Sequence, residues 1–244
     1  TWLFRAGPIV GLAAVVAALT LVPMGELPAP LSFQGDLLLF AYLLCLMRFF
    51  TVIAALDTGS SFEGMGASRE VLFSALAEPA LLLGLAAVAL ETRQVSLSPM
   101  LATVSMETWL HQGPAFALVT VALGMVLLAE NSRIPFDDPN THLELTMIHE
   151  VMVLDHGGPD LAFILYGAAL KLWALAVLLV SLLVPLRSGS LLLDAGAFLG
   201  GMVLLGVLIG TVESSMARLR LLRVPKLLVG ATALAVLALV LILR

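Results

Sequence analysis

A few charged side chains interrupt the longest apolar stretches of this sequence. Glu78 and Lys171 lie inside stretches built otherwise from aliphatic residues, and Glu130 and Glu213 lie at the ends of two others. A charge within a hydrocarbon layer is costly unless it is protonated, paired or hydrated. We therefore expect Glu78 to exchange a proton or pair with an ion beside a wet cavity; the structural alternative is a hydrogen bond across a kink at Pro79. We expect Lys171 to pair with a carboxylate of another helix or another subunit.

A polar segment, residues 57–70, precedes the third apolar stretch. Its glycines, Gly59, Gly64 and Gly66, favour a turn-forming loop, and Ser68 is a suitable N-cap for the helix that follows. An ordinary capped loop is one interpretation of this segment. The other is a functional loop, because its charges are dense for a connector: Glu63, Arg69 and Glu70.

A second polar segment follows Glu130. Asp138 and Pro139 suit the N-cap and first position of a helix, and apolar residues then alternate with charged ones up to about residue 154. We expect an interfacial or re-entrant amphipathic helix near 139–156, since it is too polar for a full span.

The histidines and the single cysteine argue against a metal or haem centre. His142, His149 and His156 recur every seven residues, so on a helix they lie about 10.5 Å apart, too far for one metal ion. All four histidines fall outside the apolar stretches, and Cys45 alone cannot hold a cluster. We expect no catalytic residue, metal or redox cofactor in this chain.

The composition indicates which elements must position these groups. The chain has 244 residues, 61% of them apolar and only 12% charged, which is far below the charge content of soluble domains. We predict an all-α polytopic membrane bundle with a single domain over 1–244. Seven stretches are long enough to cross the bilayer: 3–25, 36–57, 69–91, 113–131, 159–186, 190–213 and 225–243.

Lysine and arginine positions predict the orientation. With the N-terminus in the cytoplasm, the basic run from Arg218 to Lys226 lies inside, as the positive-inside rule requires. Most of the 17 acidic residues then fall on the same side, although acidic residues contribute little to topology. A protein that served only as a membrane anchor would not need this excess of acidic residues on one side. The net charge of −5 also argues against nucleic acid as a partner.

Several motifs resemble one known family. The segment Leu128-Ala-Glu-Asn-Ser-Arg-Ile-Pro-Phe-Asp137 resembles a family signature, which Glu144-Leu145 and Gly157-Gly158-Pro159 continue in order. The family is the membrane subunit shared by respiratory complex I and the energy-converting, membrane-bound nickel–iron hydrogenases. Residues 57–79 and 213–220 are more similar to the hydrogenase and formate hydrogenlyase branch than to the quinone-reducing branch.

The resemblance implies a fold, a location and partners. It implies a tilted bundle in the cytoplasmic membrane of a prokaryote, with one further helix ahead of Thr1. It also implies hydrophilic hydrogenase or dehydrogenase subunits on the cytoplasmic face, with their nickel–iron and iron–sulfur centres, and antiporter-like subunits in the membrane. The residues implied to line a chamber that opens to the redox arm are Glu63, Arg69, Glu78, Glu130, Arg133, Asp137 and Glu144.

The leading hypothesis is a coupling subunit, itself non-catalytic, that relays redox events to proton- or sodium-translocating subunits. A quinone-chamber subunit of a complex I-like enzyme is the first alternative, and a stand-alone ion carrier the second. The sequence disfavours the carrier because it lacks two matching halves with broken helices. The candidate residues for ion coupling or chamber lining are Glu63, Arg69, Glu70, Glu78, Glu130, Arg133, Asp137, Asp138, Glu144, Glu150, Asp155, Lys171 and Glu213.

Overall fold

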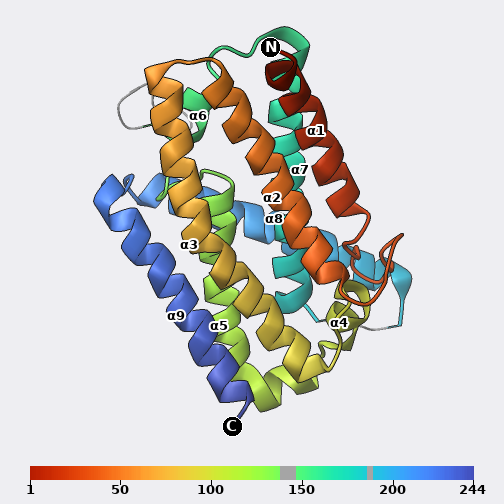
Figure 1. Cartoon of the computed structure of the whole chain (residues 1–244). Helices are drawn as coiled ribbons and strands as arrows, with labels where there is room; N and C mark the ends of the chain where they lie inside the picture. Colours follow the sequence, from red (N-terminus) through yellow and green to blue (C-terminus); the bar gives the residue numbers. More distant parts are fainter. Residues whose placement is uncertain (138–146, 186–188) are drawn as a thin grey trace.

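The computed structural model describes residues 1–137, 147–185 and 189–244, and helices dominate these ranges. Most of the helices follow one another along the chain with short connections, and a longer one, residues 20–35, joins α1 to α2 (Figure 1). Their bounds are α1 (Trp2–Leu19), α2 (Asp36–Asp57), α3 (Ser61–Thr92), α4 (Leu97–Thr103), α5 (Met106–Glu130), α6 (His149–Met152), α7 (Gly158–Leu183), α8 (Leu191–Ser215) and α9 (Val224–Ile242), with a 3₁₀ turn at Leu221–Arg223 ahead of α9.

Seven helices among the described residues are long and apolar enough to cross a membrane: α1, α2, α3, α5, α7, α8 and α9. They coincide with the seven stretches predicted from hydropathy, so the predicted fold class is confirmed. The chain is a multi-pass membrane protein.

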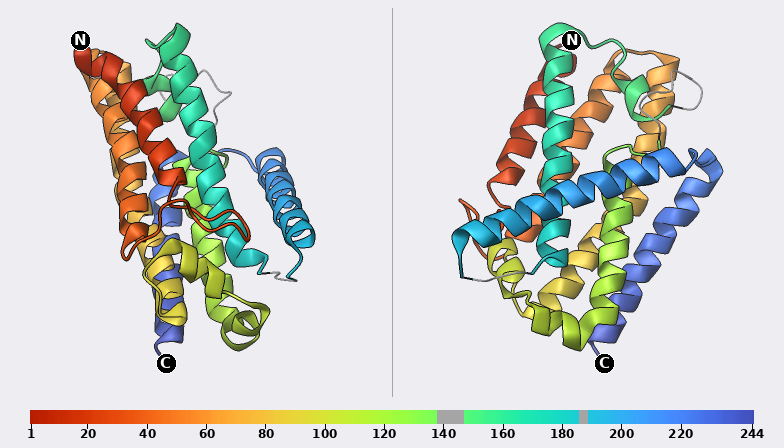
Figure 2. Two further views of the ribbon diagram at one scale, coloured as in Figure 1. Left: turned by 90° about the vertical axis from the view of Figure 1, so that its right-hand side faces the viewer. Right: turned by 180° about the vertical axis from the view of Figure 1, so that it is seen from behind.

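Six of these helices form the bundle, and the seventh lies across it. α1 packs on α2 and α7, while α3 packs on α5 and α9. α8 runs obliquely over the outside of the bundle, as both views in Figure 2 show. Only 11% of its apolar window is buried within the chain, against 56% for α7. α8 therefore contributes little to the core of this chain.

The segment between α2 and α3 differs from the prediction. Helix α3 begins at Ser61, not near Ser68, so Glu63, Arg69 and Glu70 are helical and the turn is confined to residues 58–60. A Cβ on Gly66 would lie 2.3 Å from Val151 of the neighbouring segment. Gly66 therefore permits close packing rather than a turn, and this tertiary contact is what hydropathy could not indicate.

The predicted interfacial helix is only partly described. Residues 138–146, with Asp138 and Glu144, lie outside the described residues, and from 147 to 156 only His149–Met152 is helical. This short helix, α6, packs on α3. The described part thus contains one helical turn, not the longer amphipathic helix that the sequence predicted.

A buried carboxylate lies at the end of the bundle where α2 begins. Asp36, at the first turn of α2, is fully buried and accepts hydrogen bonds from the backbone N–H groups of Phe33 (3.2 Å) and Leu97 (2.7 Å) and from the Ser96 hydroxyl (2.5 Å). These bonds tie the start of α2 to the start of α4, a short helix that the sequence analysis did not predict.

Candidate functional site

Arg48, in the middle of α2, forms ion pairs with three carboxylates. Its Nη1 donates to Oε1 of Glu78 at 2.6 Å, and its Nη2 donates to Oε2 of Glu130. Its Nε lies 3.4 Å from Oε1 of Glu70. Arg48 is only 8% exposed, so this charge is held inside the protein by its partners. We call Arg48, Glu70, Glu78, Glu130 and Lys171 the ion-pair cluster.

Lys171 completes the cluster from α7. Its Nζ lies 3.8 Å from Oε2 of Glu130, and both residues are buried. The prediction that Lys171 pairs with a carboxylate of another helix is confirmed. Glu130 therefore stands between two cations, Arg48 on α2 and Lys171 on α7.

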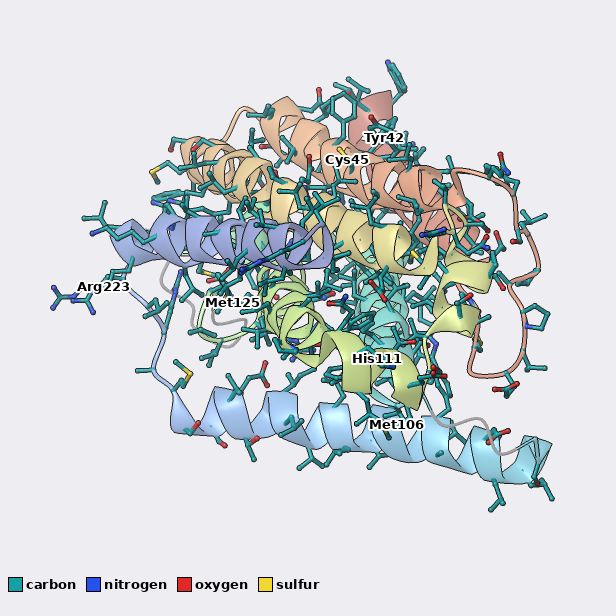
Figure 3. The ribbon with its side chains drawn as sticks, turned by 90° about the horizontal axis from the view of Figure 1, so that it is seen from below. Tyr42, Cys45, Met106, His111, Met125 and Arg223 are labelled. Atoms are coloured by element: carbon teal, nitrogen blue, oxygen red, sulfur yellow. The ribbon has the colours of Figure 1, made fainter. Side chains whose placement is uncertain are left out.

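Four helices bring these charges together. Glu130 is the last residue of α5, where the carboxyl end of the helix carries partial negative charge that favours nearby cations. Arg48 and Lys171 meet it there from helices whose other buried residues are apolar or small, apart from Asp36 at the start of α2. Figure 3 shows α2, with Tyr42 and Cys45 labelled, lying over α3 and α5 when the bundle is seen from below.

A second group of charges lies beyond the end of α5. Oδ2 of Asp137 accepts hydrogen bonds from the N–H groups of Ile148 (3.1 Å) and His149 (3.2 Å), and its Oδ1 lies 2.8 Å from Nη2 of Arg218. Arg133 pairs with Glu213 at 3.4 Å. These contacts join the segment after α5 to α6 and to the segment that follows α8.

Burial affects the titration of the histidines near this end. Burial, assisted by the charge of Lys171, lowers the pKa of His149 to about 4. The pKa of His156 is also lowered by burial, against the opposing effect of Asp160 and Asp155. The ring of His156 stacks on Phe4 at 3.9 Å between centroids. Both imidazoles are therefore neutral at pH 7 in the folded protein.

Small cavities adjoin the ion-pair cluster. One of about 20 Å³ is bordered by Glu70, Glu130, Ser132 and Asp137, which is space for about one water molecule among three carboxylates. Another, of about 50 Å³, lies between α2 and α3 and is bordered by Glu78. A more open pocket of about 230 Å³ is lined by residues that include Asp137, His149 and Glu150.

Most of the predicted site residues meet at these two places. Glu70, Glu78, Glu130 and Lys171 belong to the ion-pair cluster, and Arg133, Asp137, Glu150 and Glu213 lie at the adjoining group or its pocket. Arg69 instead donates to the carbonyl oxygen of Met147 at 2.9 Å.

Two predicted residues lie elsewhere. Glu63 is buried, accepts a hydrogen bond from the Thr58 hydroxyl and also interacts with the backbone of Asp155, away from the ion-pair cluster. Asp155 is exposed. Asp138 and Glu144 belong to the part of the chain outside the described residues.

The sequence analysis missed Arg48, which has the most ion pairs in the cluster. The signal was present, because Arg48 interrupts an apolar stretch just as Lys171 does. It also missed Arg218, whose place in a basic run hid its pairing with Asp137.

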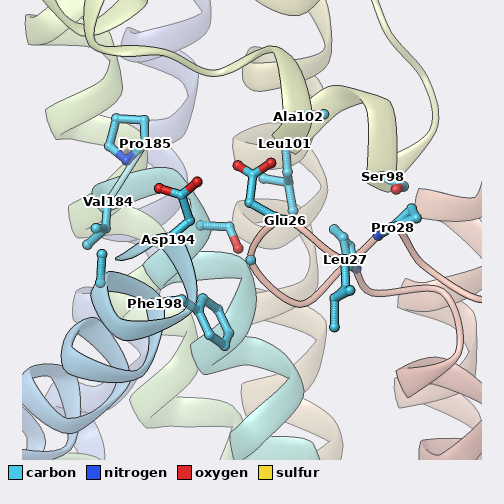
Figure 4. A pocket seen from close by; sticks show the side chains of 14 residues that line it. Glu26, Leu27, Pro28, Ser98, Leu101, Ala102, Val184, Pro185, Asp194 and Phe198 are labelled. Carbon is cyan, nitrogen blue, oxygen red and sulfur yellow. The ribbon is translucent and has the colours of Figure 1, made fainter. Parts of the chain in front are cut away.

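A further polar pocket, of about 90 Å³, lies at the other end of the bundle, beside α4 (Figure 4). Glu26 and Asp194 are among its lining residues, and it shares no lining residue with the cluster's cavities.

The fold and the site together define a polytopic helical membrane protein that encloses a buried ion-pair cluster. The particular family follows from its sequence profile: the chain belongs to the NADH dehydrogenase family, whose profile matches residues 1–243.

Two relatives are similar to this chain in sequence, and one solved structure shares its fold. The chain is 32% identical to formate hydrogenlyase subunit 4 of Escherichia coli K12 over 227 residues, covering 90% of this chain and 72% of the relative. It is 32% identical to hydrogenase-4 component C of the same organism over 226 residues, covering 90% and 70%. A chain of the membrane-bound sulfane sulfur reductase, an archaeal respiratory membrane complex, shares the fold with a TM-score of 0.82 and 21% identity, covering 99% of this chain and 80% of that one. The resemblance predicted from the motifs is confirmed.

Proposed function

We propose that this chain is the membrane coupling subunit of a redox-driven ion pump. In this role it docks a hydrophilic hydrogenase-type module on the cytoplasmic face and relays to proton- or sodium-translocating, antiporter-like subunits. The observation that carries the proposal is the sharing of Arg48 by three carboxylates with Lys171 beside them. Support for the hydrogenase branch comes from the names of the two E. coli relatives.

The charge balance of the cluster suits a relay. Its three carboxylates and two cations sum to one negative charge when all are ionised. A net charge away from water is costly, so one proton shared among the carboxylates is favoured. A proton that moves onto one carboxylate weakens its hold on Arg48 and strengthens the hold of the other two. The cluster can therefore take several arrangements of similar energy, which is what a charge relay needs.

The cavities support a path along which protons would reach the ion-pair cluster. The pocket beside His149 and the water-sized cavity both border Asp137, and the cavity borders Glu70 and Glu130. Water in that cavity would bring these carboxylates within reach of one another. Redox events in a docked module would act on this path by shifting the charge or position of the group around Asp137.

The test is a measurement of ions moved per turnover. Glu130→Gln keeps the shape of the side chain and removes its charge, so hydrogen turnover should continue while ion uptake into inverted membrane vesicles falls by tenfold or more. Glu144→Gln should act in the same direction. Glu107→Gln is the matched control, because that side chain is 84% exposed at the far end of α5. Unchanged ion uptake per molecule of hydrogen turned over in both test variants would contradict the proposal.

A second candidate is the quinone-chamber subunit of a complex I-like enzyme, which the family profile of an NADH dehydrogenase favours. The pocket beside Arg133 and His149 has about 230 Å³, whereas small-molecule sites occupy roughly 300–1,000 Å³. The names of the two E. coli relatives make the coupling role the better-supported one. Quinone that copurifies with the complex, or inhibition by quinone-site blockers, would favour the second candidate.

A further inference from the structure

A shallow apolar groove runs between α3 and α9, which lie side by side in Figure 1. Its volume is about 570 Å³. Its walls are Leu76 and Pro79 of α3 and Val229, Thr232, Ala233, Val236, Leu237 and Val240 of α9. The groove opens outward from the bundle, and its lining is suited to an aliphatic chain.

Exposed cations lie at one end of this groove. Arg223 and Lys226, at the start of α9, are exposed, and Figure 3 shows Arg223 reaching away from the bundle. Within the described part of the chain, no carboxylate forms an ion pair with either side chain; Arg218, by contrast, pairs with Asp137. Two exposed cations therefore stand at the amino end of a helix, where partial positive charge adds to their field.

The cationic end and the groove belong to one face of α9. Lys226, Val229, Ala233, Leu237 and Val240 recur at spacings of three and four residues, which places them along one side of a helix. A molecule lying along this face would meet a positive group first and an apolar trough below it. α9 has 19 residues and is about 28 Å long, close to the thickness of the hydrocarbon layer.

We propose that this face binds an anionic phospholipid, with the phosphate at Arg223 and Lys226 and one acyl chain in the α3–α9 groove. Charge complementarity selects this occupant, because a zwitterionic headgroup brings its own cation beside the two side chains and offers them no net negative charge. The bound chain would contact Pro79, the residue after Glu78 of the ion-pair cluster, so the lipid supports the α3 turn that carries this carboxylate.

The test compares two lipids with identical acyl chains, phosphatidylglycerol and phosphatidylcholine. The full chain, purified in detergent with its associated subunits, is titrated with each lipid and the bound lipid counted by native mass spectrometry. The wild type should bind phosphatidylglycerol more tightly. Each cation near an anionic headgroup contributes roughly fivefold in affinity, so Arg223→Gln with Lys226→Gln should weaken phosphatidylglycerol binding about 25-fold. Ala233→Trp, which fills the groove, should weaken it as well.

Matched controls separate this site from general lipid adhesion. Arg244→Gln removes a cation that follows the opposite end of α9. Val203→Trp adds an indole at a 69% exposed position on α8. Neither variant should change lipid binding. Equal binding of the two lipids by the wild type would overturn the proposal, and so would phosphatidylglycerol binding that survives both test variants. Cross-linking of an Ala233→Cys variant to a helix of another subunit would overturn it too, since protein would then occupy the groove.

A second measurement covers the case in which the variants do not assemble. Added phosphatidylglycerol should raise the melting temperature of the wild-type protein more than phosphatidylcholine does. An equal rise with the two lipids would contradict the proposal.

Discussion

Two buried carboxylates, Asp36 at the start of α2 and Glu130 beside the middle of α2, show two different ways of placing a negative charge inside this bundle. Asp36 is held by two backbone N–H groups and a serine hydroxyl, all of them neutral donors. Glu130 is held by the charged side chains of Arg48 and Lys171, and Arg48 also pairs with Glu70 and Glu78. A water-sized cavity adjoins Glu130.

The difference teaches that burial alone does not mark a functional carboxylate. Backbone donors are fixed by the fold, so the bonds to Asp36 have one arrangement and serve to join α2 to α4. The proposed relay requires the Arg48 and Lys171 side chains to redistribute among acceptors, so that the bonds to Glu130 take several arrangements. Under that proposal, the partners of a charge, more than its depth, separate a structural group from a relay.

The strongest test of this comparison removes the shared cation. Arg48→Met leaves three carboxylates, of which Glu130 is buried, with Lys171 as their cation among the described residues, and breaking a buried ion pair such as Arg48–Glu130 on one side costs about 3–5 kcal/mol. We expect a large fall in melting temperature in detergent and a loss of ion transport. Arg5→Met, at an exposed position of α1, is the control. A melting temperature equal to that of the control would mean that Arg48 does not hold the cluster together.

The opposite end should respond differently. Asp36→Asn keeps the shape of the side chain but replaces one carboxylate oxygen by an amide nitrogen, which cannot accept a hydrogen bond. Either the Ser96 hydroxyl or the Leu97 N–H then loses its acceptor, which should cost about 1–3 kcal/mol of stability. The complexes that do fold should move the normal number of ions per turnover. Impaired coupling in folded Asp36→Asn complexes, measured in the same vesicles, would erase the distinction between the two regions.

The smallest expected effect concerns pH. Since the pKa of His149 is lowered to about 4, the folded state resists the proton that the unfolded chain takes up below its ordinary value of 6.5. Stability should therefore fall as the pH drops from about 6.5 toward 4, by about 1–2 kcal/mol at pH 5.

The check is the change in melting temperature between pH 7 and pH 5 in the wild type and in His149→Gln. His156 titrates in both proteins, so the difference between them isolates His149. A wild type and a variant with the same change would show that His149 is not buried in its neutral form.

Much of the fold follows from hydropathy, because lipid demands long apolar helices and few other elements satisfy the backbone. Most ends of the seven spans were predictable to within a few residues, but α3 and α5 begin earlier because polar sequence continues the helix, and α1 ends at Leu19, six residues before the predicted end. Packing against α6, with Gly66 at the contact, decides the case of α3, and no local pattern reports it. The oblique course of α8 was equally hidden, since its apolar sequence is what a bilayer-crossing helix also requires.

The sequence indicated which acidic residues belong to the site better than it indicated how they are arranged. Glu78, Glu130 and Lys171 are conspicuous as charges in or beside apolar sequence, and the need for a partner predicted an ion pair. That Arg48 would bind three carboxylates depends on how α2, α3 and α5 converge, which the sequence does not reveal. Arg48 would have been among the candidate residues if basic and acidic residues within the apolar stretches had been given equal weight.

The most direct test of the relay is a redox-induced infrared difference spectrum of the intact complex. Reduction with hydrogen should produce a band from a carboxyl group that gains or loses its proton. This band should disappear or shift in Glu130→Gln and in Glu70→Gln and should persist in Asp36→Asn. A spectrum with no carboxyl band, or one that Glu130→Gln and Glu70→Gln leave unchanged, would contradict the claim that the ion-pair cluster changes protonation during turnover.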